Sequence, residues 1–250
     1  MFVKKYFNES LESFVVKLLK RIWQWFWRLL ALGAGLVLLY QIWIFAHIWW
    51  WVNHNPSDSS FMEIRLEVLQ NKNPDAELRH KWEPYDRISM NLKRALVSAE
   101  DSRFLEHDGF DLEGIQRAYE KNLKKGKVVA GGSTISQQLA KNLFLSGERS
   151  YLRKAEEAII TVMLEQMMTK RRILEIYMNV IEWGDGVFGA EAAARHYFKT
   201  SSARLSPEQA AKLAAMVPRP RFYDRHRYSA ILARRTGIIL SRMYQVEVPR

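Results

Sequence analysis

The pattern of apolar and polar residues divides the chain into an apolar N-terminal stretch and a longer amphipathic part. Residues 29–52 carry no formally charged side chain and exceed the roughly 20 residues that a helix needs to cross a bilayer. From about Phe61 onward, apolar residues recur every three or four positions, and no sustained alternation predicts strands. The pattern therefore predicts one transmembrane helix followed by a mainly α-helical domain.

Local signals place the ends of several helices in this domain. Asp111 can cap a helix that Gly126 ends, and residues 206–209 combine a capping box with a proline at the first helical position. The run 159–164 is apolar on all sides, which predicts a helix through the middle of the core. The expected helices cover residues 91–100, 112–125, 134–144, 151–168, 170–181, 190–197, 207–216 and 229–243.

Aromatic and basic residues predict how the apolar stretch lies in a membrane. Tryptophans gather at 23–27 and at 49–51, which is the placement of interfacial aromatic belts. Lysines and arginines precede the stretch, whereas residues 53–60 contain neither. The positive-inside rule then places the N-terminus in the cytoplasm and the domain outside. The length of the stretch and the absence of a small-residue cleavage site favour an uncleaved anchor over a signal peptide.

These signals predict four parts of the chain. Residues 1–28 form a cytoplasmic segment, 29–52 the transmembrane helix, 53–60 a turn-rich linker and 61–250 the outer domain. The formal charge of +11 and the pI of about 9.8 indicate an anionic partner, for which nucleic acid, an acidic membrane surface and a phosphorylated substrate all qualify. The lack of cysteine excludes disulfides, thiolate nucleophiles and cysteine-zinc sites.

Two polar stretches, residues 100–109 and 131–142, hold acids, bases and amides where a helical protein would bury apolar groups. In the second stretch, Thr134, Gln138 and Lys141 share one helical face, and the preceding glycines leave backbone amides free for an anion. A merely solvated polar face is the alternative. Arg153 and Glu157 lie one helical turn apart, which an ordinary surface ion pair would also explain.

Glu100 ends a predicted helix. The negative end of the helix dipole and the adjacent Asp101 would raise its pKa toward that of a general base, although a solvated acid at a frayed terminus is common. His107 precedes Asp108-Gly109 and is expected to anchor a loop. It has no partner at metal-ligand spacing, which argues against a zinc site.

Taken in order with residues 153–158 and 170–179, the two stretches resemble the conserved motifs of the peptidoglycan glycosyltransferases (glycosyltransferase family fifty-one), and most closely those of its monofunctional, membrane-anchored members. The resemblance implies a lysozyme-like helical domain with a small membrane-associated subdomain. It implies a single-pass protein of the bacterial inner membrane with a periplasmic catalytic domain. Lipid II would be the acceptor, and the growing glycan strand, still bound to undecaprenyl pyrophosphate, the donor.

The resemblance also implies roles for individual residues. Glu100 would deprotonate the acceptor's 4-hydroxyl, which displaces the pyrophosphate with inversion. Glu157, the second essential carboxylate, would orient cations, bind a divalent ion such as Mg or Mn, or contact the acceptor. No cofactor is required by the sequence. The expected pyrophosphate-binding residues are Lys141, Arg153, Lys154, Ser133, Thr134, Gln138 and Asn142, and the expected site-shaping residues are Asp101, Phe104, His107, Gly109 and Gln137.

Other readings of the sequence lead to different partners. A lysozyme-like lytic enzyme also uses one key glutamate, but a neutral glycan offers nothing for Lys141 and Arg153 to hold. A non-catalytic scaffold would bind other cell-wall synthesis or division proteins through the basic surface. Nucleic acid is disfavoured by the outward topology. The absence of a Ser-x-x-Lys motif argues against transpeptidase activity.

Overall fold

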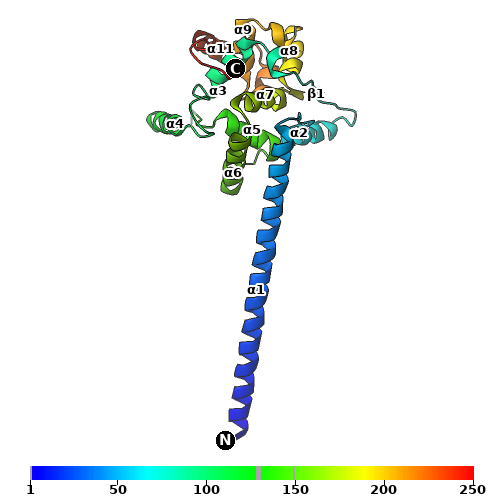
Figure 1. The fold of residues 1–250 in the computed structure, drawn as a ribbon, viewed down its shortest axis with the longest axis vertical. Coiled ribbons are helices and arrows are strands. Elements are labelled where there is room, and N and C mark those ends of the chain that lie inside the picture. Colours follow the sequence, from blue (N-terminus) through cyan, green and yellow to red (C-terminus); the bar gives the residue numbers. More distant parts are fainter. Residues whose placement is uncertain (1, 128–130, 149) are drawn as a thin grey trace. The chain divides into compact units, whose positions relative to one another are not determined.

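The computed structural model describes residues 2–127, 131–148 and 150–250, with side chains from Lys17 onward. The described chain is mainly helical, as predicted (Figure 1). Its helices are α1 (Phe2–Trp51), α2 (Ser60–Gln70), α3 (Met90–Glu100), α4 (Leu112–Lys125), α5 (Ile135–Phe144), α6 (Tyr151–Met167), α7 (Lys170–Val180), α8 (Ala190–Phe198), α9 (Pro207–Met216), α10 (Pro220–Arg225) and α11 (Ala230–Arg242). Two 3-10 turns, Tyr85–Arg87 and Ser202–Arg204, and three short strands complete it.

The expected helices of the domain are confirmed, and the capping residues explain their starts. Asp111 accepts a hydrogen bond from the backbone of Gly114, and Ser206 forms the predicted capping box with Gln209. The sequence analysis missed α2, α10 and a small sheet in the order β1-β3-β2. The strands β1 (Arg79–His80), β2 (Glu182–Gly184) and β3 (Val187–Phe188) are too short to show an alternating pattern.

The core of the domain has two helical groups. Helices α9 and α11 pack against α3, and α5 packs against both α6 and α7. The C-terminal helix α11 thus packs on the domain, as its apolar positions indicate. Trp183, Tyr177, Phe104 and Phe188 are the largest fully buried side chains. The end of α3 lies beside α5, because Gln138 of α5 donates to Glu100 and the backbone of Ile135 donates to Asp101. Both helices carry predicted site residues.

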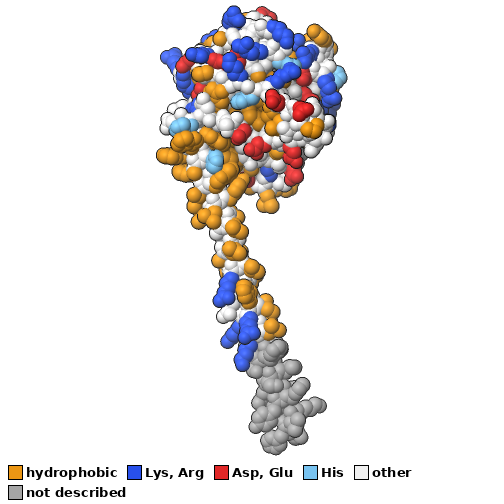
Figure 2. Space-filling view, turned by 90° about the vertical axis from the view of Figure 1, so that its right-hand side faces the viewer, with side chains coloured by type: hydrophobic (Ala, Val, Ile, Leu, Met, Phe, Trp, Pro, Cys, Tyr) orange, Lys and Arg blue, Asp and Glu red, His pale blue; other side chains and the backbone are white. Residues whose placement is uncertain are grey.

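Helix α1 is long and apolar enough to span a membrane between Lys17 and Trp51. Its large apolar side chains are exposed over much of that length. Its described basic residues, from Lys17 to Arg28, lie toward the N-terminal end, as Figure 2 shows in blue on the helix. The predicted span 29–52 coincides with the uncharged part, and the bilayer boundaries remain a prediction.

The linker after α1 is fastened to the domain by one arginine. Arg172 of α7 donates from Nε to the carbonyl oxygen of Trp51 over 3.0 Å. Its guanidinium also donates to the carbonyl of His54 and to the side-chain oxygen of Asn55, over 2.6 and 3.0 Å. These bonds fix the start of the linker, and the bond to Trp51 satisfies a carbonyl in the last turn of α1 that has no partner within the helix.

The prediction that residues 159–164 run through the middle of the core is wrong. Ile160, Thr161 and Leu164 are fully buried, but Ile159 and Val162 are 46% and 48% exposed. The apolar run has one buried face and one uncovered face, because only one side of α6 packs against its neighbours. Helix α4 also exposes apolar side chains, including Leu112, Tyr119 and Leu123.

Candidate active site

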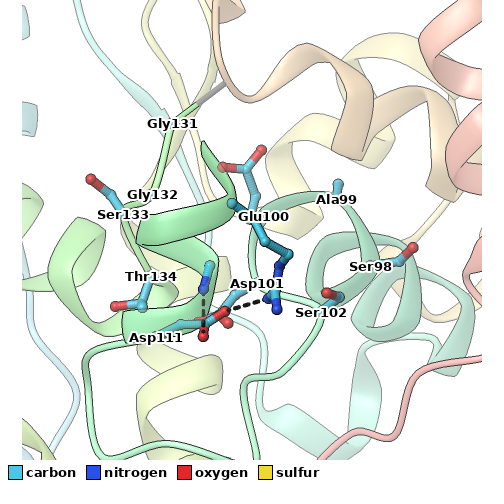
Figure 3. A pocket seen from close by; sticks show the side chains of 12 residues that line it. Ser98, Ala99, Glu100, Asp101, Ser102, Asp111, Gly131, Gly132, Ser133 and Thr134 are labelled. Carbon is cyan, nitrogen blue, oxygen red and sulfur yellow. Dashed lines mark hydrogen bonds and ion pairs between the residues drawn. The ribbon is translucent and has the colours of Figure 1, made fainter. Parts of the chain in front are cut away.

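A cleft of about 170 Å³ opens beside Glu100 (Figure 3). Three segments form its walls: the end of α3, the start of α4 and the segment before α5. The sequence analysis predicted a site at the first and third of these segments, and the fold brings them together. The lining residues are Ser98, Ala99, Glu100, Asp101, Ser102, Asp111, Gly114, Arg117, Gly131, Gly132, Ser133 and Thr134.

Glu100 is the last residue of α3, and its side chain is half-buried. Its Oε2 accepts a hydrogen bond from Nε2 of Gln138 over 2.8 Å. Burial raises the pKa of the Glu100 carboxyl, and the Gln138 bond and the charges of Arg235 and Lys141 oppose this rise. Asp101 raises the pKa further, but less than burial does. The direction matches the sequence-based expectation, whereas the main cause is desolvation rather than the neighbouring acid.

Asp101 lies at the wall of the cleft and joins the loop after α3 to the start of α5. Its side chain is 2% exposed, and Oδ1 lies 2.9 Å from Nε2 of His107. Its Oδ2 accepts from the backbone N–H of Ile135, over 3.0 Å, in the first turn of α5. The N–H of Gly109 donates to Nδ1 of His107, so Nε2 carries the proton that is donated to Asp101. Asp101 and His107 therefore hold the loop after α3 against the start of α5, and their role in shaping the site stays a prediction.

Thr134 and Gln137 form a capping box at the start of α5. The Thr134 hydroxyl also donates to the carbonyl oxygen of Gly109 over 2.7 Å. Because this hydroxyl is buried and committed to a loop carbonyl, its position favours a shaping role over the predicted pyrophosphate contact. Gly109 has φ +92°, and a Cβ there would lie 2.7 Å from Cγ2 of Thr161, so this position requires glycine.

Gly132 allows the segment before α5 to approach α4. A Cβ on Gly132 would lie 3.0 Å from the Cα of Ile115. The neighbouring Ser133 is exposed at the cleft, where its hydroxyl is accessible to a ligand. Of the predicted neutral donors, Ser133 is the one that lies free at the cleft wall.

A second charged group lies at the start of α6. Glu157 is only 3% exposed, and its carboxylate binds NH1 of Arg153 over 2.7 Å and the ammonium of Lys154. The Nε of Arg153 is buried and has no hydrogen-bond partner within the described residues. Glu157 thus holds two cations in place, which supports the first of its three predicted roles, the orientation of cations.

Lys141 of α5 links the two charged groups. It is half-buried, and burial lowers the pKa of its ammonium, while Glu157 raises it and Arg153 and Lys154 lower it. Glu100 also acts on this pKa. Glu100, Glu157, Arg153 and Lys154 all act on this one ammonium, so Lys141 lies near both the Glu100 cleft and the charged group at α6.

The remaining predicted residues have structural contacts. Asn142 is buried, and its amide donates to the carbonyl of Gln138 over 2.6 Å. Phe104 is fully buried, with the Lys170 ammonium 4.7 Å above its ring. For the predicted divalent ion near Glu157, the described residues contain no group of three or more His, Asp or Glu side chains placed to hold a metal.

Several residues at the site had no predicted role. The Tyr177 hydroxyl donates to Oε1 of Gln138 over 2.9 Å, and the Lys170 ammonium donates to the carbonyl of His107 and to Glu165 over 2.6 and 2.8 Å. Arg117 of α4 lines the cleft, and Arg235 of α11 acts on Glu100. Lys170 and Tyr177 lie in residues 170–179, whose resemblance to the family could have singled them out. No local pattern marks Arg117 or Arg235.

Comparison with known proteins identifies the family of the chain. The model of the transglycosylase family matches residues 67–244. The chain belongs to the transglycosylase family. It is 64% identical over 226 residues to a biosynthetic peptidoglycan transglycosylase of Methylobacillus flagellatus, covering 90% of this chain and 99% of that relative.

Two further relatives carry the same description. The chain is 60% identical over 232 residues to the protein of Thiobacillus denitrificans, covering 93% of this chain and all of the relative. It is 64% identical over 222 residues to that of Chromobacterium violaceum, covering 89% and 97%. These matches confirm the enzyme class and the peptidoglycan glycosyltransferase family that the motifs indicated.

Proposed function

We propose that this transglycosylase polymerises lipid II into glycan strands, with Glu100 as the general base. The observation that carries the proposal is a half-buried carboxylate of raised pKa in a cleft, together with a buried glutamate that binds two cations and a lysine on which both carboxylates act. A raised pKa suits a group that must take a proton near neutral pH. Cations suit a leaving group on which negative charge develops.

The proposed reaction is a single displacement. The Glu100 carboxylate takes the proton of the acceptor's 4-hydroxyl, and that oxygen forms a bond to the anomeric carbon of the donor. The bond from this carbon to the pyrophosphate oxygen breaks, and undecaprenyl pyrophosphate leaves with the electron pair. Attack from the face opposite the leaving group inverts the anomeric configuration.

In this proposal the cations lie on the leaving-group side. Lys141 and Arg153 neutralise the charge that grows on the pyrophosphate, with Lys154 in support. Glu157 keeps the last two in position through the contacts described above. No proton donor to the leaving oxygen is needed, because pyrophosphate leaves as an anion. A lysozyme-like hydrolase, in contrast, requires such an acid.

We further propose that the enzyme is anchored in the inner membrane by α1, with its N-terminus in the cytoplasm and its domain in the periplasm. The basic residues at the N-terminal end of α1 support this orientation. The exposed apolar faces of α4 and α6 support the membrane-associated subdomain, since they would otherwise face water. The sequence lacks a Ser-x-x-Lys motif, so we assign no transpeptidase activity.

The test is polymerisation of labelled lipid II by the purified full chain in detergent. Wild type is expected to form polymer that muramidase digests, and Glu100→Gln to form none. Glu106→Gln is the matched control, because Glu106 lies in the loop that follows α3 and its side chain is 61% exposed. The anomeric configuration of the new linkage, measured by NMR, tests inversion. Polymer from Glu100→Gln at the wild-type rate would refute the assignment of the base.

If the folded wild type binds lipid II but forms no polymer, the non-catalytic scaffold becomes the better reading. If the wild type instead cleaves finished glycan strands, the lytic enzyme becomes the better interpretation.

A further inference from the structure

The buried tyrosine of α7 contacts the candidate base through one intermediate side chain. Tyr177 is fully buried, and its hydroxyl lies 2.9 Å from Oε1 of Gln138. At the other end of the same carboxamide, Nε2 lies 2.8 Å from Oε2 of Glu100. The packing of α5 against α7 brings these side chains into one line from the core to the cleft.

The chemistry of the three groups fixes the direction of both hydrogen bonds. An ionised carboxylate only accepts, so the NH2 end of Gln138 must face Glu100. The oxygen of the carboxamide then faces Tyr177, which donates. Burial raises the pKa of the Tyr177 hydroxyl well above its usual value, so this donor keeps its proton at any pH at which the enzyme works.

We propose that Tyr177 is a positioning residue for the reaction, which holds the Gln138 carboxamide so that its N–H always faces the Glu100 carboxylate. This inference rests on the proposed function, because it takes Glu100 as the base. Without the tyrosine hydroxyl, the buried oxygen of Gln138 loses its donor, and the carboxamide can turn its oxygen toward Glu100. Two facing acceptors repel and favour the protonated, inactive form of the acid.

The predicted signature is therefore a change in the pH profile. The hydrogen bond from Gln138 lowers the pKa of Glu100 against the larger effect of burial. When the bond is weakened, the pKa rises, and the pH below which activity is lost moves upward. The charges that act on Glu100 are Asp101 beside it, Lys141 of α5 and Arg235 of α11. Tyr177→Phe changes none of these charges.

The experiment compares the rate of lipid II polymerisation against pH for wild type and Tyr177→Phe in the full chain. The acid limb, the pH range in which the rate falls as the pH is lowered, is expected to move up by about one pH unit. A hydrogen bond to a charged group stabilises it by an energy equal to a pKa shift of roughly that size or more. The rate then falls about tenfold on the acid side and is nearly wild type on the alkaline side. Tyr197→Phe is the matched control, because it removes a hydroxyl that donates to the carbonyl of Trp183 over 3.0 Å.

A double-variant cycle separates an effect through Gln138 from a direct one. Gln138→Met removes the donor to Glu100 and should raise the acid limb by at least as much as Tyr177→Phe. In the Gln138→Met background, Tyr177→Phe should move it no further. An acid limb that Tyr177→Phe leaves in place, or a full additional shift in the double variant, would overturn the proposal.

Thermal melting completes the test. Phenylalanine fills the same space, so cooperative unfolding is expected in both tyrosine variants. Loss of cooperative unfolding in Tyr177→Phe but not in Tyr197→Phe would also overturn the proposal, since the Tyr177 hydroxyl would then stabilise the fold as a whole. Failure of the proposed function has a different signature: the wild type forms no polymer, or Glu100→Gln still does.

Discussion

Replacement of Asp101 by asparagine tests how the site is held together. The Asp101 carboxylate is buried and accepts from the side chain of His107 and from the backbone of Ile135. Asparagine has one acceptor oxygen and one NH2 group, so it can accept only one of these bonds. The NH2 group then faces the other N–H, and two donors are left opposed in a buried place.

The size of the effect follows from these two bonds. A hydrogen bond to a charged group contributes about 1.5–3 kcal/mol, and one between neutral groups about 0.5–1.5 kcal/mol. Loss of one charged bond and weakening of the other predicts a decrease of about 2–4 kcal/mol in the free energy of unfolding. For a chain of this size, this corresponds to a fall of roughly 5–15 °C in the melting temperature.

The assay is thermal melting of the full chain in detergent near neutral pH. Asp108→Asn is the matched control, because Asp108 is an exposed acid in the same loop; it should melt close to wild type. Polymerisation should also fall in Asp101→Asn, because the start of α5 carries Gln138 toward Glu100. A melting temperature within about 2 °C of wild type, or an equal fall in Asp108→Asn, would refute this account of Asp101.

Three further predictions concern other parts of the site. Because burial raises the pKa of Glu100, the folded protein holds this proton more tightly than the unfolded chain, and ionisation destabilises the fold as pH rises through that pKa. Glu100→Gln should therefore melt above wild type at neutral pH, with the difference closing below about pH 4; an unchanged difference across pH would contradict this. Lys141→Met should lower kcat for polymerisation by a factor of about 10²–10³, and Lys141→Arg should retain more of the wild-type kcat. Equal rates for wild type and both variants would argue against a charge role. Gly109→Ala, at positive φ and in steric conflict, should lower the free energy of unfolding by at least about 1–3 kcal/mol, whereas Gly131→Ala, with open space around it, should change it little; denaturant titration measures both.

The sequence alone determined the elements that local rules control. Periodicity and capping residues predicted the helices of the domain, and the long uncharged stretch predicted the anchor. The ordered motifs predicted the family, which the comparisons confirm. The pKa direction of Glu100 was also predicted, since any acid at the end of a helix beside another acid tends that way.

Only the tertiary structure decided what each site residue contacts. Gln138 was expected at the pyrophosphate, but its amide donates to Glu100, because α7 places Tyr177 behind it. The charge of Arg235 lowers the pKa of Glu100 only because α11 packs on α3. Such partners are separated by tens of residues, and no local spacing encodes a contact between helices.

The apolar run in α6 shows the same limit for burial. Ile159 and Val162 are as apolar as their buried neighbours, yet they are exposed because none of the described elements covers that face. From the sequence alone, an apolar side chain is predicted only to avoid water. Whether protein or lipid provides the apolar surroundings depends on how the helices pack, and that is a property of the fold.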